Sequence, residues 1–462
     1  MRFKLAMTAA LAVITAPIMS TTATAQSPAT SSATAPASAA TYAIRHLDND
    51  ILLEAYKQSI SDASHGKYLD ATFGMLKRLG VQRIEQIDDP DVVDQWAQVM
   101  SCMTGLPTFN PAKGADFKVP AEQVADLRTA DAVAAIPEIV RRAKETSIVI
   151  LDENHLDPRG RAFGLEVARA LRPLGYTVLA AEALKRDVED AASFSRMAKL
   201  AADGYPRQAS GYYLDDPVFA DFIRQSLALG YRPVAYESTR TDYAKDPLEA
   251  QGQREQDQAD NLIRRALKQY PGAKILVYVG EHHIAERPIA AEGGKVAMMA
   301  ERLKRVTGID PLTIDQAGLS SLPMNRPDAD LYAIAAPKAQ GQSMVLMRHG
   351  QPLVVGLLAG SVDLQVVHPP TVQAGGRPDW LTIMQRKTAP VPQELLPASG
   401  MRLVQAFVAG EEEDAIPVDQ VLVSAGTAAP MLMLPSQPVR YAVQDIGWDA
   451  GANDGKPNQP AP

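Results

Sequence analysis

Residues 131–322 show short apolar runs separated by longer amphipathic stretches. The run at 147–151 is rich in β-branched residues, which predicts a buried strand. The sequence Asp-Glu-Asn-His follows at 152–155, and the stretch 158–174 then predicts a helix. Ligands of open α/β sheets bind where strands turn into helices, so this strand end is a candidate ligand site.

Further strands are predicted in the same part of the chain, each separated from the next by a helical stretch. A strand–helix–strand repeat implies right-handed crossovers, which make neighbouring strands parallel and bring their carboxyl ends to one edge. The predicted fold class of this core, residues 131–322, is therefore α/β, with a mostly parallel sheet flanked by helices. The further strands are expected at 176–181, 231–236, 274–279 and 312–314.

The regions on either side of the core have different patterns. Residues 46–130 carry apolar side chains at helical spacing, which predicts an N-terminal helical region. Residues 323–450 contain short strand-like runs punctuated by Gly and Pro, the first at 331–336, which predicts a β-rich C-terminal domain. The polar residues 451–462 are expected to form a disordered tail.

The first residues are typical of a secretory signal peptide spanning residues 1–25. Arg2 and Lys4 precede an apolar run at 5–18, and Ala-Thr-Ala at 23–25 fits a cleavage site. That run is too short to span a bilayer, so no stable membrane span is expected after cleavage. The Ser/Ala/Thr/Pro-rich residues 26–45 predict a disordered linker. The expected location is therefore the periplasm or the extracellular space.

Charge and cysteine content exclude several classes of site. The formal net charge of -8 gives no basic footprint, so no nucleic-acid partner is expected. Cys102 is the only cysteine, which rules out an intrachain disulfide and a cysteine-based zinc site. Any metal ion must therefore be held by His, Asp and Glu. The sequence does not indicate an oligomeric state.

Carboxylates and histidines follow the predicted strands and should meet at one edge of the sheet. Two histidines with a carboxylate can form a divalent-metal site that keeps one position open. The same groups without a metal would let one histidine act as a general base on water, oriented by carboxylates. The strand-end residues are Asp152, Glu153, His155, Glu182, Glu237, Glu281, His282, His283 and Asp315.

The order of these residues resembles the superfamily of TraB and TIKI proteins, ChaN-like haem-uptake proteins and erythromycin esterases, over about residues 135–316. Its first motif, Gly-Glu-x-His, matches at Glu153 and His155, with Asp152 in place of the glycine. Its intermediate glutamate matches Glu182. The remaining matches are Arg254 to Asn261, with Glu255 and Gln258 departing from the Arg-Asp-x-x-Met-Ala-x-Asn pattern, and an intact Gly-x-x-His at Gly280 and His283.

The resemblance implies three different activities. TIKI-like members are metal-dependent proteases, erythromycin esterase-like members hydrolyse an ester with a histidine-activated water, and ChaN-like members bind haem. The first hypothesis is therefore hydrolysis of an ester or amide bond in a small-molecule or peptide substrate. The second is haem or iron binding without turnover. The third is a catalytically silent interaction module of the cell envelope, which the Asp152 departure keeps open.

Under the first hypothesis each matched residue has an expected role. His155, Glu182 and His283 would bind a divalent metal ion or position a water molecule. Glu153 is the candidate general base, and Arg254 would stabilise a carboxylate or a developing oxyanion. If no metal binds, His155 becomes the base.

Overall fold

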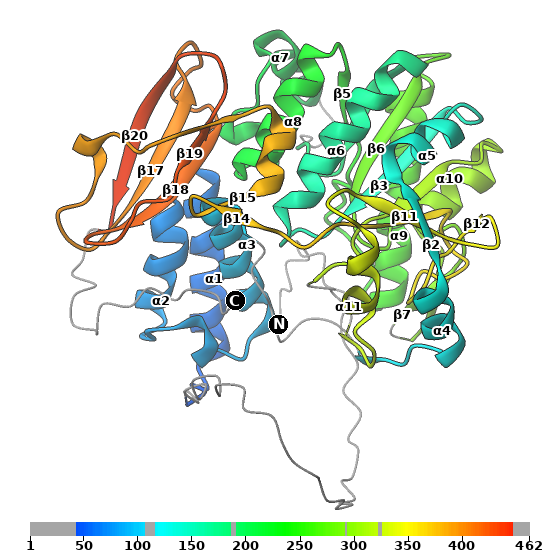
Figure 1. Cartoon of the computed structure of the whole chain (residues 1–462), viewed down its shortest axis with the longest axis horizontal. Helices are drawn as coiled ribbons and strands as arrows, with labels where there is room; N and C mark the ends of the chain where they lie inside the picture. The colour runs from blue at the N-terminus through cyan, green and yellow to red at the C-terminus, as the bar shows by residue number, and fades with distance from the viewer. Residues whose placement is uncertain (1–42, 107–115, 186–190, 292, 322–325, 447–462) are drawn as a thin grey trace, which may run out of the picture.

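The computed structural model describes residues 43–106, 116–185, 191–291, 293–321 and 326–446 (Figure 1). The predicted signal peptide, the polar tail and most of the predicted linker lie outside these ranges. Export of the protein therefore stays a prediction. Within the described ranges, no helix combines the length and apolar character that crossing a bilayer requires.

A mixed, mostly parallel sheet forms the centre of the molecule, which confirms the predicted α/β class. Neighbours in the order β13-β9-β3-β6-β4-β5 are all parallel. At the other end, β11 pairs antiparallel with β13, β12 and β2. The strands are β2 (Asp131–Ala134), β3 (Ile148–Glu153), β4 (Tyr176–Ala181), β5 (Arg232–Ala235), β6 (Lys274–Gly280), β9 (Leu312–Asp315), β11 (Met344–Arg348), β12 (Gln351–Pro352) and β13 (Leu364–Val367).

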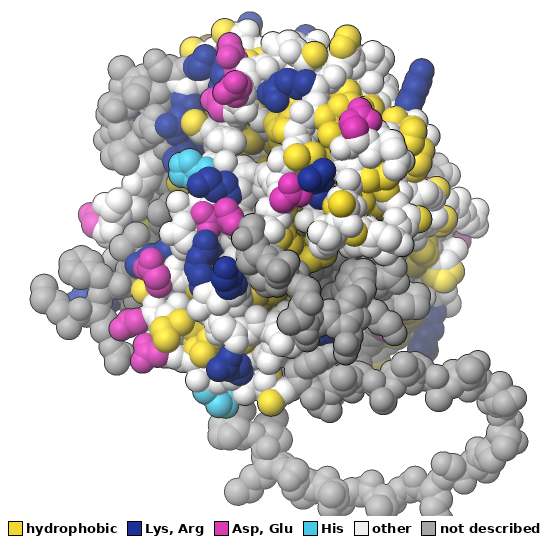
Figure 2. All heavy atoms as spheres, turned by 90° about the vertical axis from the view of Figure 1, so that its left-hand side faces the viewer, with side chains coloured by type: hydrophobic (Ala, Val, Ile, Leu, Met, Phe, Trp, Pro, Cys, Tyr) yellow, Lys and Arg dark blue, Asp and Glu magenta, His cyan; other side chains and the backbone are white. Residues whose placement is uncertain are grey.

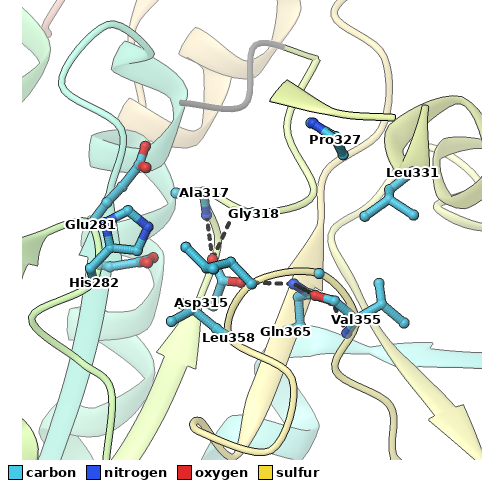
Figure 3. Close-up of a pocket in the computed structure, with 13 residues that line it drawn as sticks. Glu281, His282, Asp315, Ala317, Gly318, Pro327, Leu331, Val355, Leu358 and Gln365 are labelled. Atoms are coloured by element: carbon cyan, nitrogen blue, oxygen red, sulfur yellow. Dashed lines mark hydrogen bonds between the residues drawn. The ribbon is translucent and has the colours of Figure 1, made fainter. Parts of the chain in front are cut away.

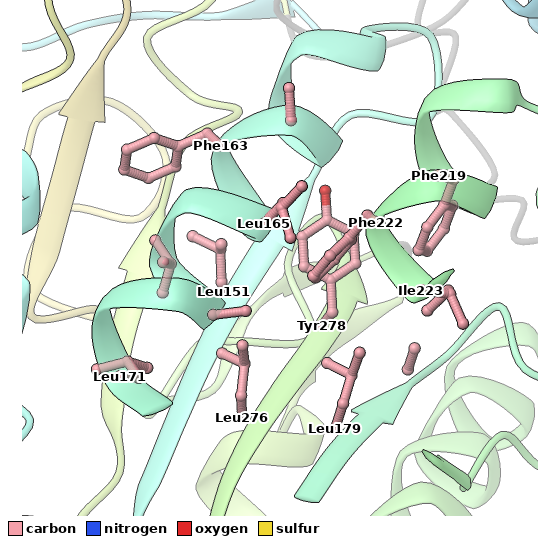
Figure 4. Packing of buried hydrophobic residues seen from close by; sticks show 14 of the residues in the cluster. Leu151, Phe163, Leu165, Leu171, Leu179, Phe219, Phe222, Ile223, Leu276 and Tyr278 are labelled. Carbon is pink, nitrogen blue, oxygen red and sulfur yellow. The ribbon is translucent and has the colours of Figure 1, made fainter. Parts of the chain in front are cut away.

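The central strands are apolar along most of their length because helices cover both faces of the sheet, and their polar residues lie mainly at the strand ends. Every residue of β3 is buried, and its side chains alternate between two separate cores. Leu151 packs in the core that contains Phe163, Phe222 and Tyr278 (Figure 4), whereas Ile150 packs in the core on the opposite face. The first core is covered by α6 (Pro158–Leu171) and α8 (Pro217–Ala228), and the second by α9 (Pro247–Leu262) and α10 (Met299–Thr307).

The sheet extends past residue 322, where the sequence pattern changes. Strands β11, β12 and β13 come from beyond that residue, and β13 lies parallel beside β9. The strand predicted at 331–336 is wrong, because Leu331–Ala335 forms helix α11. The Asp330 side chain caps its first turn by accepting from Ala333 N at 2.9 Å, and Leu331 and Ala335, four residues apart, are both buried.

The predicted helical N-terminal region packs against an antiparallel sheet from the C-terminal region (Figure 1). Tyr68 and Met103 share a buried cluster with Leu403 of β17, and Gln444 of β20 donates to Gly66 O at 2.6 Å. On the side of the molecule that Figure 2 shows, acidic and basic side chains are interspersed. The elements here are α1 (Asn49–Ser64), a π-helical turn (Asp70–Gly74), α2 (Met75–Arg78), α3 (Pro90–Thr104), β17 (Met401–Val408), β18 (Asp419–Ser424) and β20 (Val439–Asp445).

Shorter elements connect these layers. Four small two-stranded sheets pair β1 with β10, β7 with β8, β14 with β15 and β16 with β19 within the described residues. Their bounds, with those of the remaining helices, are α4 (Ala121–Thr129), α5 (Ala135–Arg142), α7 (Ala191–Asp203), β1 (Asp116–Phe117), β7 (Ile289–Ala291), β8 (Gly294–Val296), β10 (Arg326–Pro327), β14 (Gln373–Ala374), β15 (Arg377–Pro378), β16 (Lys387–Ala389) and β19 (Leu432–Leu434).

Candidate active site

The carboxyl ends of β3, β4 and β6 bring three of the predicted site residues together over Gly280. A Cβ atom built on Gly280 would lie 2.9 Å from His155 Nε2 and 3.1 Å from Glu182 Oε2. Both side chains therefore converge on the position that a side chain at residue 280 would occupy. The Nε2 atom of His283 lies 3.8 Å from Glu182 Oε1. His155, Glu182 and His283, which are far apart in sequence, therefore share one site.

His155 is held by a chain of buried charges on the α6 and α8 side of the sheet. Its Nδ1 donates to Glu153 Oε1 at 2.9 Å. Glu153 Oε2 accepts from Arg161 Nε at 2.8 Å and from the Tyr278 hydroxyl at 3.1 Å. Arg161 also donates to Asp216 Oδ2 at 2.7 Å. Burial by itself raises the pKa of Glu153, but Arg161 and His155 hold it below its usual range.

Glu153 is therefore placed to orient His155 rather than to take a proton itself. Both of its oxygens already accept hydrogen bonds, and its side chain is only 2 % exposed. The lowered pKa further reduces its capacity as a base. This arrangement does not support the role of general base that the sequence analysis gave to Glu153.

His283 has its own buried glutamate on the opposite side of the site. Its Nδ1 lies 2.8 Å from Glu255 Oε1, and Glu255 Oε2 accepts from Met299 N at 2.7 Å. Burial lowers the pKa of His283, but the charge and hydrogen bond of Glu255 outweigh burial, so the net shift is upward. The site thus contains two histidines, each with Nδ1 bonded to a fully buried glutamate.

Arg254 lies between the carboxylates of the site. Its guanidinium donates to Glu182 and, at 2.6 Å, to Glu237 Oε2. Its NH1 atom lies 3.3 Å from His283 Nε2. Burial raises the pKa of Glu182, but His283, Arg254 and His155 outweigh it and lower this pKa to about 2. Glu182 is therefore ionised near neutral pH.

The predicted metal-binding set does not fit a divalent ion in this arrangement. Both Glu182 oxygens accept hydrogen bonds, one from Arg254 and the other from Gly280 N. The Arg254 guanidinium also contacts His283 Nε2, so a positive charge already occupies the space between the donors. Among the described residues, no group of three or more His, Cys, Asp or Glu side chains is arranged to hold a metal ion. The prediction that His155, Glu182 and His283 bind metal is therefore not supported.

Four predicted strand-end residues lie elsewhere. Glu281, His282 and Asp315 line a separate cavity of about 40 Å³, together with Asp152 (Figure 3). Asp152 and Glu153 are adjacent in β3, so their side chains point to opposite faces of the sheet. Burial and the neighbouring Asp315 raise the pKa of Asp152 well above its usual range. Burial lowers the pKa of His282 to about 4, with His283 adding to the effect.

Sequence reasoning missed three residues that support His155, two of them through Glu153 and one by direct contact. Arg161 lies on α6, and no sequence pattern indicates its role, because its two carboxylate partners are unrelated to it in sequence spacing. Asp216 also caps α8, since it accepts from Val218 N at 3.0 Å. Tyr213 stacks on His155 with ring centroids 4.3 Å apart, and nothing in the sequence pattern indicated that contact.

No protein-family model matches this chain, and no curated protein sequence matches it. Solved structures with local similarity include one described as bacterial protein toxins, which is 19% identical with a TM-score of 0.31 and covers 42% of this chain and 39% of that chain. RRSP, a MARTX toxin effector domain from Vibrio vulnificus CMCP6, is 14% identical with a TM-score of 0.31 and covers 54% of both chains. ChaN of Campylobacter jejuni, described with cofacial haem binding, is 8% identical with a TM-score of 0.34 and covers 53% of this chain and 96% of that one.

This chain spans about two fifths of the length of the toxin structure and about half that of RRSP. Similarities of this strength assign neither a family nor an activity. Membership in the superfamily that the motifs resemble therefore stays a prediction, and so does haem binding.

Proposed function

We propose that this protein is a hydrolase of ester or amide bonds in which His155 activates a water molecule. One observation carries the proposal: His155 Nδ1 is bonded to the ionised Glu153, while Nε2 faces the space over Gly280 beside Glu182. A histidine held in this way keeps its Nε2 lone pair available to accept a proton. The His155 side chain is 14% exposed, so solvent reaches it.

In this reaction His155 Nε2 takes a proton from water as the water oxygen attacks the carbonyl carbon. Glu153, bonded to Nδ1, stabilises the imidazolium that forms. Arg254 places positive charge beside the developing oxyanion and holds Glu182 in position. The bond to the leaving group then breaks, and the leaving oxygen or nitrogen takes a proton.

His283 is the proposed donor of that proton. Burial and the neighbouring Arg254 lower the pKa of His283, but Glu255 and Glu182 outweigh them, so the net upward shift favours the protonated imidazole. Its Nε2 faces Glu182 across the site, on the side opposite His155. The two histidines would thus act as base and acid, and the proton gained by His155 returns to His283 through solvent.

The test measures hydrolysis of p-nitrophenyl acetate and of a fluorogenic peptide library by the wild type and by His155→Gln. The variant should lose at least about 100-fold in kcat/KM, because general-base catalysis contributes roughly 10²- to 10⁴-fold. His65→Gln is the matched control, since His65 is an exposed histidine outside the site. Equal turnover by His155→Gln and the wild type would refute the proposal.

Haem binding without turnover is distinguished in the same preparations. Haemin is titrated into the wild type and the His155→Gln variant while the Soret band is followed. A band that saturates at one equivalent, together with no hydrolysis of either probe, would replace the hydrolase proposal with a binding protein. If the protein neither hydrolyses a probe nor binds haemin, both proposals are refuted and the catalytically silent interaction module is favoured.

A further inference from the structure

The backbone is strained at Tyr213, directly beside the candidate base. Tyr213 has φ +54°, in the left-handed region that bulky residues rarely adopt. Leu214 N donates to Tyr212 O at 2.5 Å, so a hydrogen bond closes a turn around this single residue. A turn of this kind with positive φ at its centre is rare and costs free energy. Strained backbone of this kind clusters at functional sites, where the surrounding structure holds it in place.

The segment that carries Tyr213 is fixed at both ends. On one side, Tyr212 N donates to Ala183 O at 2.8 Å in the loop after β4. On the other side, Asp216 caps α8. The Tyr68 hydroxyl, from the N-terminal helical region, donates to Asp215 O at 2.8 Å. Contacts from three parts of the chain therefore hold the strained turn.

The result of this strain is a face-to-face contact with His155. The two rings lie with centroids 4.3 Å apart and planes inclined by 18°. The Glu153 hydrogen bond fixes the direction of Nδ1 within the plane of the imidazole, and Tyr213 limits rotation out of that plane. Together the two contacts keep Nε2 directed over Gly280.

The same segment also supplies Asp216, which binds Arg161 at 2.7 Å, and Arg161 in turn binds Glu153. Both contacts that orient His155 thus depend on residues 211–216. We propose that Tyr213 is a positioning residue for His155 and that its strained turn serves to place the tyrosine ring against the imidazole. The assignment of His155 as the catalytic base rests on the proposed hydrolase function.

The test uses Tyr213→Phe, which keeps the ring, and Tyr213→Leu, which removes it. Tyr213→Asn is a second variant without the ring, and asparagine tolerates positive φ, so its turn can form. Tyr441→Leu is the matched control, because Tyr441 is a tyrosine of β20 outside the site and is 37% exposed. Thermal melting of every variant confirms that it is folded.

The primary measurement needs no substrate. Long-range ¹H–¹⁵N spectra of histidine-labelled protein report the tautomer of His155, whose signals are assigned with His155→Gln. The wild type, Tyr213→Phe and Tyr441→Leu should show one neutral tautomer, protonated on Nδ1. Tyr213→Leu and Tyr213→Asn should show averaged signals, because the ring samples several orientations.

Turnover gives the second measurement. Tyr213→Leu and Tyr213→Asn should lose about 100-fold in kcat with KM nearly unchanged, since small misplacements of a catalytic group have effects of this size. Tyr213→Phe should stay within about twofold of the wild type. Folded Tyr213→Leu and Tyr213→Asn variants with the wild-type His155 spectrum would overturn the proposal. A wild type that hydrolyses no probe would refute the hydrolase function, while the spectra would still decide the role of Tyr213.

Discussion

Adding one methyl group at Gly280 tests whether the space above this residue is the reacting centre. In Gly280→Ala the new Cβ would lie 2.9 Å from His155 Nε2 and 3.1 Å from Glu182 Oε2. Gly280 does not have a positive φ, so alanine fits its backbone conformation. The perturbation is therefore steric and is confined to the two side chains that define the site.

The size of the effect follows from these distances. Normal van der Waals separation is about 3.5 Å, so His155 Nε2 must move by roughly half an ångström and Glu182 by slightly less. Displacements of about 1 Å cost on the order of 10²-fold in rate, which places the expected loss in kcat at about 10- to 100-fold. Overpacking should lower the free energy of unfolding by about 1–3 kcal/mol.

The assay compares ester and peptide hydrolysis by Gly280→Ala with that by Gly410→Ala. Gly410 is the matched control, because a Cβ built there meets nothing within 4 Å and its φ is not positive. Urea unfolding shows that both variants are folded at the assay temperature. If Gly280→Ala kept the wild-type kcat and KM, the reaction could not take place at His155 and Glu182, and the reasoning would be refuted.

Three further variants test the groups around the site. Glu255→Gln removes the charge that holds His283. Because a charge-assisted hydrogen bond contributes about 1.5–3 kcal/mol, its loss should reduce kcat/KM by roughly 10- to 150-fold. An unchanged kcat/KM would argue against a role for His283. Arg161→Met leaves two buried carboxylates without their cation and should lower the free energy of unfolding, measured in urea, by about 3–5 kcal/mol. A decrease below about 1 kcal/mol would contradict the expectation that these carboxylates depend on Arg161. The raised pKa of Asp152 means that the native state keeps a proton that the unfolded chain releases above about pH 4. The free energy of unfolding therefore falls as pH rises above this value. Asp152→Asn removes that loss, so its stability relative to the wild type should increase as pH rises above about 4; a difference independent of pH would count against proton uptake by Asp152.

The sequence by itself determined the core strands and the residues that end them. Parallel strands covered on both faces are nearly continuous apolar runs, so runs such as 147–151 are visible without a structure. Because parallel strands end at one edge, the order of the motifs was enough to bring His155, Glu182 and His283 together. The same reasoning failed at 331–336, where Asp330 caps a helix that the apolar run alone does not distinguish from a strand.

Only the tertiary structure decided which strand-end residues share a site and what each one bonds to. Asp152 lies near the end of β3, Glu281 and His282 follow β6, and Asp315 ends β9 at the same edge of the sheet, yet these four residues line a separate cavity. The partners of the site come from elsewhere in the chain: Arg161 from α6, Glu255 from α9 and Tyr213 from a strained turn. Hydrophobic periodicity is a local property, whereas pairing of buried charges and support of a strained turn depend on distances that exist only after the layers have packed.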